Sequence, residues 1–262
     1  MKKFIAFALA LVMCMGLMAA CGAAGTEGGS ATESGKPKLV MATNAQFPPY
    51  EFYEGDAIVG IDAEIAGAIA NKLGLELVIE DMEFDSIIEA VKGGKADMGL
   101  AGMTVTEERK ESVDFTATYA TGVQVIIVPE GSAITSADDL FAEGAFTTIG
   151  VQRNTTGDLY TTWDLEDAGM ATIDRYSKGS DAVQALKTGK VDCVVIDNEP
   201  AKAFVDAVDG LKILDTEYVL EDYAAAMSKE NTALYEAVNA ALEELIADGT
   251  VKTIVEKYIP AQ

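Results

Sequence analysis

The sequence predicts an α/β protein of two similar lobes, because one helix-to-strand pattern occurs twice, about a hundred residues apart. It reads AVKGGKAD at residues 90–97 and ALKTGKVD at residues 185–192. In both copies apolar residues at helical spacing precede a glycine that ends the helix, and a short apolar run typical of a buried strand follows. The runs end at Ala101, Gly102 and Asp197. Ligands of such sheets bind beyond the carboxyl ends of the strands, which predicts a site in the cleft between the lobes.

The amino terminus has the composition of an export signal. Lys2 and Lys3 precede an apolar run at residues 4–18, which is too short for a membrane-spanning helix. The following LMAACG resembles the lipobox of bacterial lipoproteins, in which the cysteine is diacylated and becomes the new amino terminus. We therefore predict a lipoprotein signal peptide at residues 1–20 and a lipid on Cys21.

Composition excludes several classes of function. Residues 21–36 are small and polar and should form a flexible tether. Without residues 1–20 the chain keeps 17 basic residues against 43 acidic ones, a net charge of −26 that excludes nucleic acid as a partner. The chain has no histidine, which removes Ser-His-Asp and Cys-His catalysis and histidine metal sites. Cys193 lies in an apolar run and is expected to be a buried hydrophobe. We predict no enzyme activity, no cofactor and no metal.

Lobe one is expected to begin near Pro37. Its first helix has Asp62 as the predicted N-cap and Gly74 as the stop, and Asp85 is predicted to cap the helix of the first repeat copy. The expected elements of this lobe are a strand at 38–42, a helix at 62–73, a strand at 75–79 and the first helix-to-strand copy.

Two strands are expected to join the lobes. The apolar run 123–128 should carry the chain into lobe two and the run 223–227 should carry it back, a hinge that allows bending but limits sliding. We therefore assign residues 37–122 and 228–262 to lobe one, and residues 123–227 to the hinge strands and lobe two. The expected elements are a strand at 147–151, a helix at 155–164, a strand at 171–175, the second copy, a helix at 200–208 and, after the return, helices at 232–247 and 250–258.

Three side chains have two interpretations when residue type alone is considered. Arg109 stands among charged neighbours and fits an exposed helical turn as well as a binding site. Phe84 fits a core position. Asp197 fits the N-cap of the helix near residue 200 as well as a place in the cleft.

Five segments resemble the family 3 extracellular solute-binding proteins, which are amino-acid-binding components of ATP-binding-cassette importers. They are GIDAEI at 60–65, FD at 84–85, GKAD at 94–97, TVTEER at 104–109 and VDFT at 113–116. The resemblance covers residues 37–260 in order. It implies the type II periplasmic-binding-protein-like fold, with two α/β lobes joined by a two-strand hinge.

The resemblance also implies a set of ligand-binding positions. Arg109 would hold the ligand's α-carboxylate as a planar bidentate donor, with help from Thr104 and from Thr156 at a helix start. A carbonyl of Gly102 and the carboxylate of Asp197 would hold the α-ammonium. The full set is Asn44, Phe47, Phe84, Ala101, Gly102, Thr104, Arg109, Gln152, Thr156 and Asp197.

The side chain of the ligand is less closely specified. Phe47 and Phe84 match positions that sandwich it, and two amides of the set match positions that read its far end. The neutral amide of Asn44 is compatible with glutamine as the ligand. The aromatic rings and the nearby Glu51 and Glu83 would also suit arginine or lysine. The resemblance therefore implies a polar or basic free amino acid.

The implied mechanism is binding by closure. A monomer takes the amino acid onto lobe one, closes lobe two over it, and presents both lobes to the permease. Lipid on Cys21 would hold it at the membrane, on the outer face in a Gram-positive host or in the periplasm of a Gram-negative one. Two other functions stay open: an enzyme like cyclohexadienyl dehydratase, with Glu199 or Asp197 as general acid, and a ligand sensor that acts through a separate partner.

Overall fold

The computed structural model describes residues 35–260, except 143 and 145. The predicted signal peptide, the predicted lipid site at Cys21 and most of the predicted tether lie outside the described residues. In the described part of the chain, no helix combines the length and the apolar character that crossing a lipid bilayer requires.

Lobe one contains a five-stranded sheet. Its strands are β1 (Lys38–Thr43), β5 (Glu76–Asp81), β6 (Met98–Gly99), β7 (Asp114–Phe115) and β14 (Ala226–Met227). Their order is β5-β1-β6-β14-β7, with β1 parallel to β5 and β6 and with β14 antiparallel to both of its neighbours. Side chains alternate along β1, so Leu39 and Met41 join one core cluster and Val40 and Ala42 join another.

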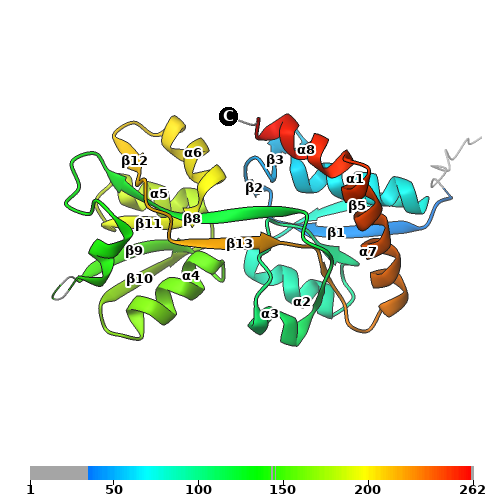
Figure 1. Ribbon diagram of the computed structural model, residues 1–262, viewed down its shortest axis with the longest axis horizontal. Helices are drawn as coiled ribbons and strands as arrows, with labels where there is room; N and C mark the ends of the chain where they lie inside the picture. The colour runs from blue at the N-terminus through cyan, green and yellow to red at the C-terminus, as the bar shows by residue number, and fades with distance from the viewer. Residues whose placement is uncertain (1–34, 143, 145, 261–262) are drawn as a thin grey trace, which may run out of the picture. The chain divides into compact units, whose positions relative to one another are not determined.

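Helices cover both faces of this sheet. They are α1 (Ile61–Leu73), the short 3-10 helix η1 (Phe84–Ser86), α2 (Ile87–Lys92), α3 (Glu107–Ser112), α7 (Thr232–Ala247) and α8 (Thr250–Tyr258). α1, α7 and α8 contact one another and form the core cluster of Leu39 and Met41, whereas α2 packs into the cluster of Ala42 (Figure 1). Both carboxy-terminal helices have the predicted bounds.

A small antiparallel sheet follows β1 in the chain. It consists of β2 (Gln46–Phe47), β3 (Glu51–Glu54) and β4 (Ala57–Val59), in the order β2-β3-β4. Phe47 lies directly opposite Glu51 in this sheet. The small sheet therefore places an aromatic ring and a carboxyl group next to each other, just after the carboxyl end of β1.

Lobe two is built around a second sheet. Its strands are β8 (Ala120–Pro129), β9 (Thr147–Gln152), β10 (Ala171–Tyr176), β11 (Cys193–Asp197), β12 (Leu211–Ile213) and β13 (Val219–Tyr223). The order is β10-β9-β11-β8-β12, and β13 pairs with β8. Alternation along β8 sends Val125 and Ile127 into one core cluster and Ile126 and Val128 into another, the same arrangement as β1 has in lobe one. Cys193 is fully buried in the second of these clusters, as predicted.

The helices of lobe two lie on both faces of its sheet (Figure 1). They are the 3-10 helix η2 (Ala137–Phe141), α4 (Thr156–Thr161), the π-helical turn η3 (Thr162–Glu166), α5 (Gly179–Lys187) and α6 (Asn198–Ala207). α5 and α6 pack against the cluster of Val125 and Ile127. The predicted two-lobed α/β class is therefore confirmed.

Two strands carry the chain between the lobes. The first half of β8 pairs antiparallel with β13, and its second half pairs with β11 and β12 in lobe two. β8 and β13 run side by side between the lobes (Figure 1). The predicted return crossing at 223–227 is misplaced, because the chain crosses in Val219–Tyr223 and Ala226–Met227 already pairs within the sheet of lobe one.

Both copies of the repeated pattern form the predicted helix and strand, since α2 leads to β6 and α5 leads to β11.

The two predicted caps in lobe one are wrong. Asp62 lies inside α1, whose N-cap is Gly60, and its buried carboxylate accepts hydrogen bonds from the rest of the lobe. Asp85 lies within η1, and α2 begins after Ser86 without a side-chain cap. Burial of Asp62 directs its carboxylate to tertiary partners instead of the helix end.

Candidate functional site

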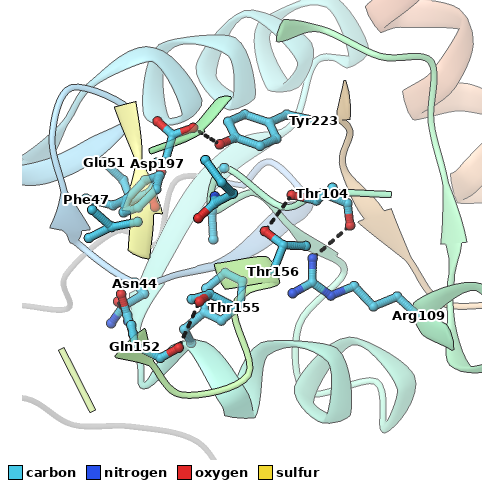
Figure 2. A pocket seen from close by; sticks show the side chains of 15 residues that line it. Asn44, Phe47, Glu51, Thr104, Arg109, Gln152, Thr155, Thr156, Asp197 and Tyr223 are labelled. Atoms are coloured by element: carbon cyan, nitrogen blue, oxygen red, sulfur yellow. Dashed lines mark hydrogen bonds between the residues drawn. The ribbon is translucent and has the colours of Figure 1, made fainter. Parts of the chain in front are cut away.

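A narrow cavity lies where the predicted rims of the two lobes meet. Its free volume is about 20 Å³, little more than the room that one water molecule needs, so the lobes are closed around it. The residues that line it come from both lobes and from the two hinge strands (Figure 2). They are Asn44, Phe47, Glu51, Phe84, Ala101, Gly102, Thr104, Arg109, Gln124, Gln152, Thr155, Thr156, Ile196, Asp197 and Tyr223.

All ten residues of the predicted binding set line this cavity, and their roles toward a ligand stay predictions. Five further residues line the cavity and were not predicted as ligand-binding residues. Gln124 is the one polar side chain in the apolar run 123–128, a signal that could have found it. Thr155 and Ile196 adjoin predicted residues, whereas nothing local in the sequence marks Tyr223. Glu51 was expected only as a nearby acid, and Glu83, its companion in that expectation, is exposed and does not line the cavity.

Arg109 is buried on the lobe-one side of the cavity, with 5% of its surface exposed. Its Nη1 donates to the carbonyl of Thr104 at 2.8 Å and its Nη2 donates to the carbonyl of Asn154 at 2.9 Å. The guanidinium carbon lies 5.4 Å from the centre of the Phe84 ring. The alternative of an exposed helical arginine is therefore wrong. Arg109 lies in the first turn of α3 and is the buried residue of this helix.

The Arg109 guanidinium is charged despite its burial. Loss of hydration lowers its pKa to about 10, which still leaves it protonated at neutral pH. No salt bridge to Arg109 occurs among the described residues, and two carbonyls use only part of a donor set of five N–H groups. The site thus presents a buried cation with donors to spare, which suits a planar anion such as a carboxylate.

Thr104 of lobe one and Thr156 of lobe two lie near Arg109, and their side chains contact each other across the cavity. Their hydroxyl oxygens are 3.4 Å apart, and Thr156 is the first residue of α4. The Thr104 hydroxyl donates to Glu221 of β13 at 3.1 Å, and the Gln124 amide donates to the same carboxylate at 3.0 Å. Glu221 does not line the cavity. It holds two lining side chains in place from the hinge strand.

Asp197 ends β11 on the other side of the cavity and is 1% exposed. Its Oδ1 accepts from the Glu199 N–H at 3.1 Å, so it caps α6, while its Oδ2 accepts from the Tyr223 hydroxyl at 2.5 Å and the Val123 N–H at 3.1 Å. Both interpretations of Asp197 therefore hold at once. Burial raises the pKa of this carboxyl to about 7, against the opposing effect of the three donors.

Two glycines let the walls of the cavity approach closely. Gly102 has φ +52°, donates its N–H to Asp62 at 2.8 Å, and would bring a Cβ within 2.9 Å of the Phe47 ring. Gly122 would bring a Cβ within 2.1 Å of the Tyr223 hydroxyl and 2.6 Å of Asp197 Oδ2. Side chains at either position would push the lining residues apart.

The far end of the cavity contains amide, aromatic and acidic groups. Gln152 of lobe two donates to Asn44 Oδ1 of lobe one at 3.0 Å, and the Asn44 amide donates to the Met82 carbonyl at 2.8 Å. The Phe47 ring lies on the same side (Figure 2), together with Glu51, which is fully buried. This end can therefore enclose a ligand side chain between aromatic and polar walls.

Comparison with known proteins finds one family along nearly the whole described chain. The family model of the bacterial extracellular solute-binding proteins, family 3, matches residues 39–261. The arginine-binding extracellular protein ArtP of Bacillus subtilis (strain 168) is 33% identical over 264 residues, covering 100% of both chains.

Solved structures show the same fold. An ancestral arginine-binding protein, solved with arginine and with glutamine, is 39% identical with a TM-score of 0.78 in both forms. The arginine form covers 85% of this chain and 98% of its own, and the glutamine form covers 86% and 99%. The ancestral amino-acid-binding protein AncCDT-1, a precursor of cyclohexadienyl dehydratase, is 29% identical with a TM-score of 0.74 and covers 84% of this chain and 95% of its own.

Proposed function

Because this chain belongs to the bacterial extracellular solute-binding proteins, family 3, we propose that it captures a polar or basic L-amino acid and delivers it to the permease of an ATP-binding-cassette importer. Arg109 is the residue on which this function depends most. It is a buried guanidinium with donors to spare, facing the carboxyl of Asp197 across one cavity (Figure 2). A cation and a carboxyl group held apart in this way complement the two charges of an amino-acid backbone.

The α-carboxylate binds between the lobes. The free N–H groups of Arg109 approach it from lobe one, and the N–H of Thr156 approaches it from the start of α4 in lobe two. The backbone N–H or hydroxyl of Thr104 completes the set. The α-ammonium binds to the carbonyl of Gly102, beside Ala101, and to the carboxylate of Asp197.

The ligand stabilises the closed arrangement of the lobes. Lobe one comprises residues 37–119 and 224–260, and residues 120–223 form the two hinge strands and lobe two. The contacts of Thr104 with Thr156 and of Asn44 with Gln152 join the lobes around the cavity, so the lobes must separate to admit a ligand. An amino acid that contacts both lobes binds the closed form more tightly and shifts the population toward it. The permease then recognises surfaces of both lobes.

The protein works as a monomer at the membrane surface. A lipid on Cys21 and the tether up to residue 36 hold the lobes near the permease and raise their effective concentration there. The composition of residues 1–21 supports this placement. In a Gram-positive host it is the outer face of the cell membrane, and in a Gram-negative host it is the periplasm.

Catalysis is not part of the proposed function. Glu199, one of the two acids considered for a dehydratase, forms a salt bridge with Lys202 at 2.5 Å and does not line the cavity. Asp197, the other, lies where the ammonium of an amino acid needs a partner. The arginine-binding and glutamine-binding relatives support a binding protein whose ligand is polar or basic.

A thermal-shift screen tests this function. The protein is unfolded, dialysed and refolded to remove any bound ligand, and its melting temperature is then measured with each of the twenty amino acids. A ligand at a hundredfold its Kd adds about 2.7 kcal/mol to the free energy of unfolding and raises the melting temperature clearly. We expect shifts only from polar or basic L-amino acids.

The control for the backbone clamp is the same amino acid with an amidated carboxylate or an acetylated ammonium, which should give no shift. If no amino acid raises the melting temperature of the refolded protein, amino-acid binding is excluded and an enzyme or a sensor becomes the better explanation.

Affinity should rise with pH up to about 7. The Asp197 carboxyl has a pKa of about 7 in this structure against an ordinary value of 3.8, and an ammonium bound to it favours the ionised form. Below pH 7 binding must therefore release a proton, and Kd should increase roughly tenfold for each pH unit of further acidification. Titration calorimetry at pH 5, 6, 7 and 8 measures the effect. A flat profile across this range would show that Asp197 is already ionised in the free protein.

A further inference from the structure

Glu221 is a buried carboxyl group on the hinge, one side chain away from the cavity. It lies within β13, is 5% exposed and does not line the cavity itself. Its Oε2 accepts from the Thr104 hydroxyl at 3.1 Å and from the Gln124 amide at 3.0 Å. Both donors line the cavity, so a single hydroxyl group separates Glu221 from a ligand that contacts Thr104.

Glu221 is held as a carboxylate. Burial raises its pKa, but three hydrogen-bond donors and the positive charge of Arg109 oppose that rise. The donors are Thr104, Gln124 and Thr156. A carboxylate accepts such hydrogen bonds without a proton of its own. A buried negative charge therefore lies beside the end of the cavity where Arg109 is placed.

Glu221 is also the main counter-charge of Arg109 within the protein. Among the charged groups that raise the pKa of Arg109 against the effect of its burial, Glu221 has the largest influence. The two side chains form no direct salt bridge in the described part of the chain. Thr104 links them instead, because its carbonyl accepts from Arg109 at 2.8 Å and its hydroxyl donates to Glu221.

A ligand carboxylate that binds to Arg109 has to share these partners with Glu221. If one of its oxygens lies at hydrogen-bond distance from the Thr104 hydroxyl, it is at most roughly 6 Å from Glu221 Oε2, the sum of two hydrogen-bond lengths. Like charges at this separation repel each other. A hydroxyl group also has only one proton, and Thr104 donates it to Glu221, so the ligand competes with Glu221 for that donor.

We propose that Glu221 limits the affinity for the amino acid, as a resident carboxylate that competes with the ligand carboxylate for Arg109 and Thr104. This inference rests on the proposed function, because it assumes that Arg109 binds the α-carboxylate of an amino acid. Glu221 keeps the buried guanidinium charged and at the same time weakens its hold on the ligand. A limited affinity favours release of the amino acid to the permease.

A purely structural role for Glu221 predicts the opposite effect. If its carboxylate only fixes Thr104 and Gln124 in place, removing the charge should loosen these lining side chains and weaken binding. Glu221→Gln separates the two roles. Glutamine has the same shape, and its amide oxygen can still accept from both donors, but it carries no charge. We therefore expect this variant to fold.

Titration calorimetry at pH 8 measures the effect with L-arginine and L-glutamine, the two ligands of the ancestral relative. At this pH the Asp197 carboxyl, whose pKa is about 7, is largely ionised, so its titration does not contribute. In Glu221→Gln both ligands should bind roughly 3- to 100-fold more tightly, the range for two unit charges about 6 Å apart at an effective dielectric constant between about 80 and about 20. The factor should be similar for both, because they share the α-carboxylate.

Three further variants serve as controls. Asp222→Asn removes the same charge from the next residue of β13, whose side chain is exposed, and should leave Kd within about twofold of wild type. Glu221→Asp keeps the charge on a shorter side chain and should not tighten binding. Glu221→Met, which is also uncharged and of similar length, takes the place of Glu221→Gln if a thermal melt shows that the glutamine variant does not fold.

The proposal fails if the charge-free variant binds both ligands no more tightly than the wild-type protein does, or if Glu221→Asp tightens binding to the same extent. It also fails if the tightening is confined to one of the two ligands, because the effect then acts on the side chain of the ligand. In each of these outcomes the wild-type protein still binds amino acids and the proposed function stands. Wild-type protein that binds no amino acid overturns the proposed function and this inference with it.

Discussion

Arg109→Met is expected to abolish amino-acid binding at concentrations that saturate the wild-type protein. Methionine keeps the length of the side chain and its packing against Phe84 but removes every N–H donor. A ligand carboxylate would then be buried without its counter-charge, and breaking a buried ion pair typically costs about 3–5 kcal/mol. That range corresponds to at least a roughly 100-fold increase in Kd, which titration calorimetry with the best ligand from the screen measures.

The variant should also be somewhat less stable, because the carbonyls of Thr104 and Asn154 lose their donor. Binding is therefore measured well below its melting temperature. Arg153→Met is the matched control. Arg153 is half-exposed, its contact with Asp85 is 3.5 Å long, and it does not line the cavity, so its loss should barely change Kd. Binding by Arg109→Met within tenfold of wild type would remove Arg109 from the clamp.

Asp197→Asn should weaken amino-acid binding by a similar factor, because it removes the negative charge that is proposed to pair with the α-ammonium. The α-ammonium would keep an oxygen acceptor but lose its ionic partner in a site from which water is largely excluded. We expect Kd to rise about 100-fold, in line with the cost of removing one partner of a buried pair. The pH dependence of Kd that is attributed to Asp197 should also flatten in this variant.

The fold of this variant should survive. Asparagine is as good an N-cap as aspartate, but one of its two terminal atoms is a donor, so either the Glu199 N–H or the pair of Val123 and Tyr223 loses an acceptor. We expect a stability loss on the order of 1–2 kcal/mol, visible in a thermal melt.

Glu199→Gln makes the matching charge change two residues further along, outside the cavity, and should leave Kd within about threefold of wild type. If Asp197→Asn binds the amino acid as tightly as wild type does, the ammonium has another partner. Glu51, the other carboxyl group that lines the cavity, is then the first candidate.

Helices and strands that depend mainly on neighbouring residues in the chain were predicted well from the sequence. The helices at 232–247 and 250–258 have the predicted bounds, because their apolar spacing and flanking residues determine them without help from the rest of the fold. The repeated helix-to-strand unit formed in both lobes for the same reason. The apolar runs became strands whose alternate side chains enter two clusters, as β1 and β8 show.

Predictions failed where a residue serves a distant partner. Asp62 has the chemistry of an N-cap, yet its carboxylate accepts from Gly102 and Tyr119, which lie 40 and 57 residues away. The return strand was placed a few residues late, because pairing with β8 selects Val219–Tyr223 over the more apolar run that follows. A local sequence pattern does not predict such tertiary contacts, because their free energy depends on which distant residues the folded chain brings together.

The sequence by itself predicted the two-lobed α/β class from its periodicity. Its resemblance to a known family predicted ten of the fifteen residues that line the cavity, because sequence motifs are properties of the chain alone. The tertiary structure decided which groups are buried and which are paired. Only the packed lobes show that Arg109 is shielded from water and that Tyr223 reaches Asp197 from the hinge. The charge and the donors of a site depend on burial and on contacts between distant residues, and folding alone creates these.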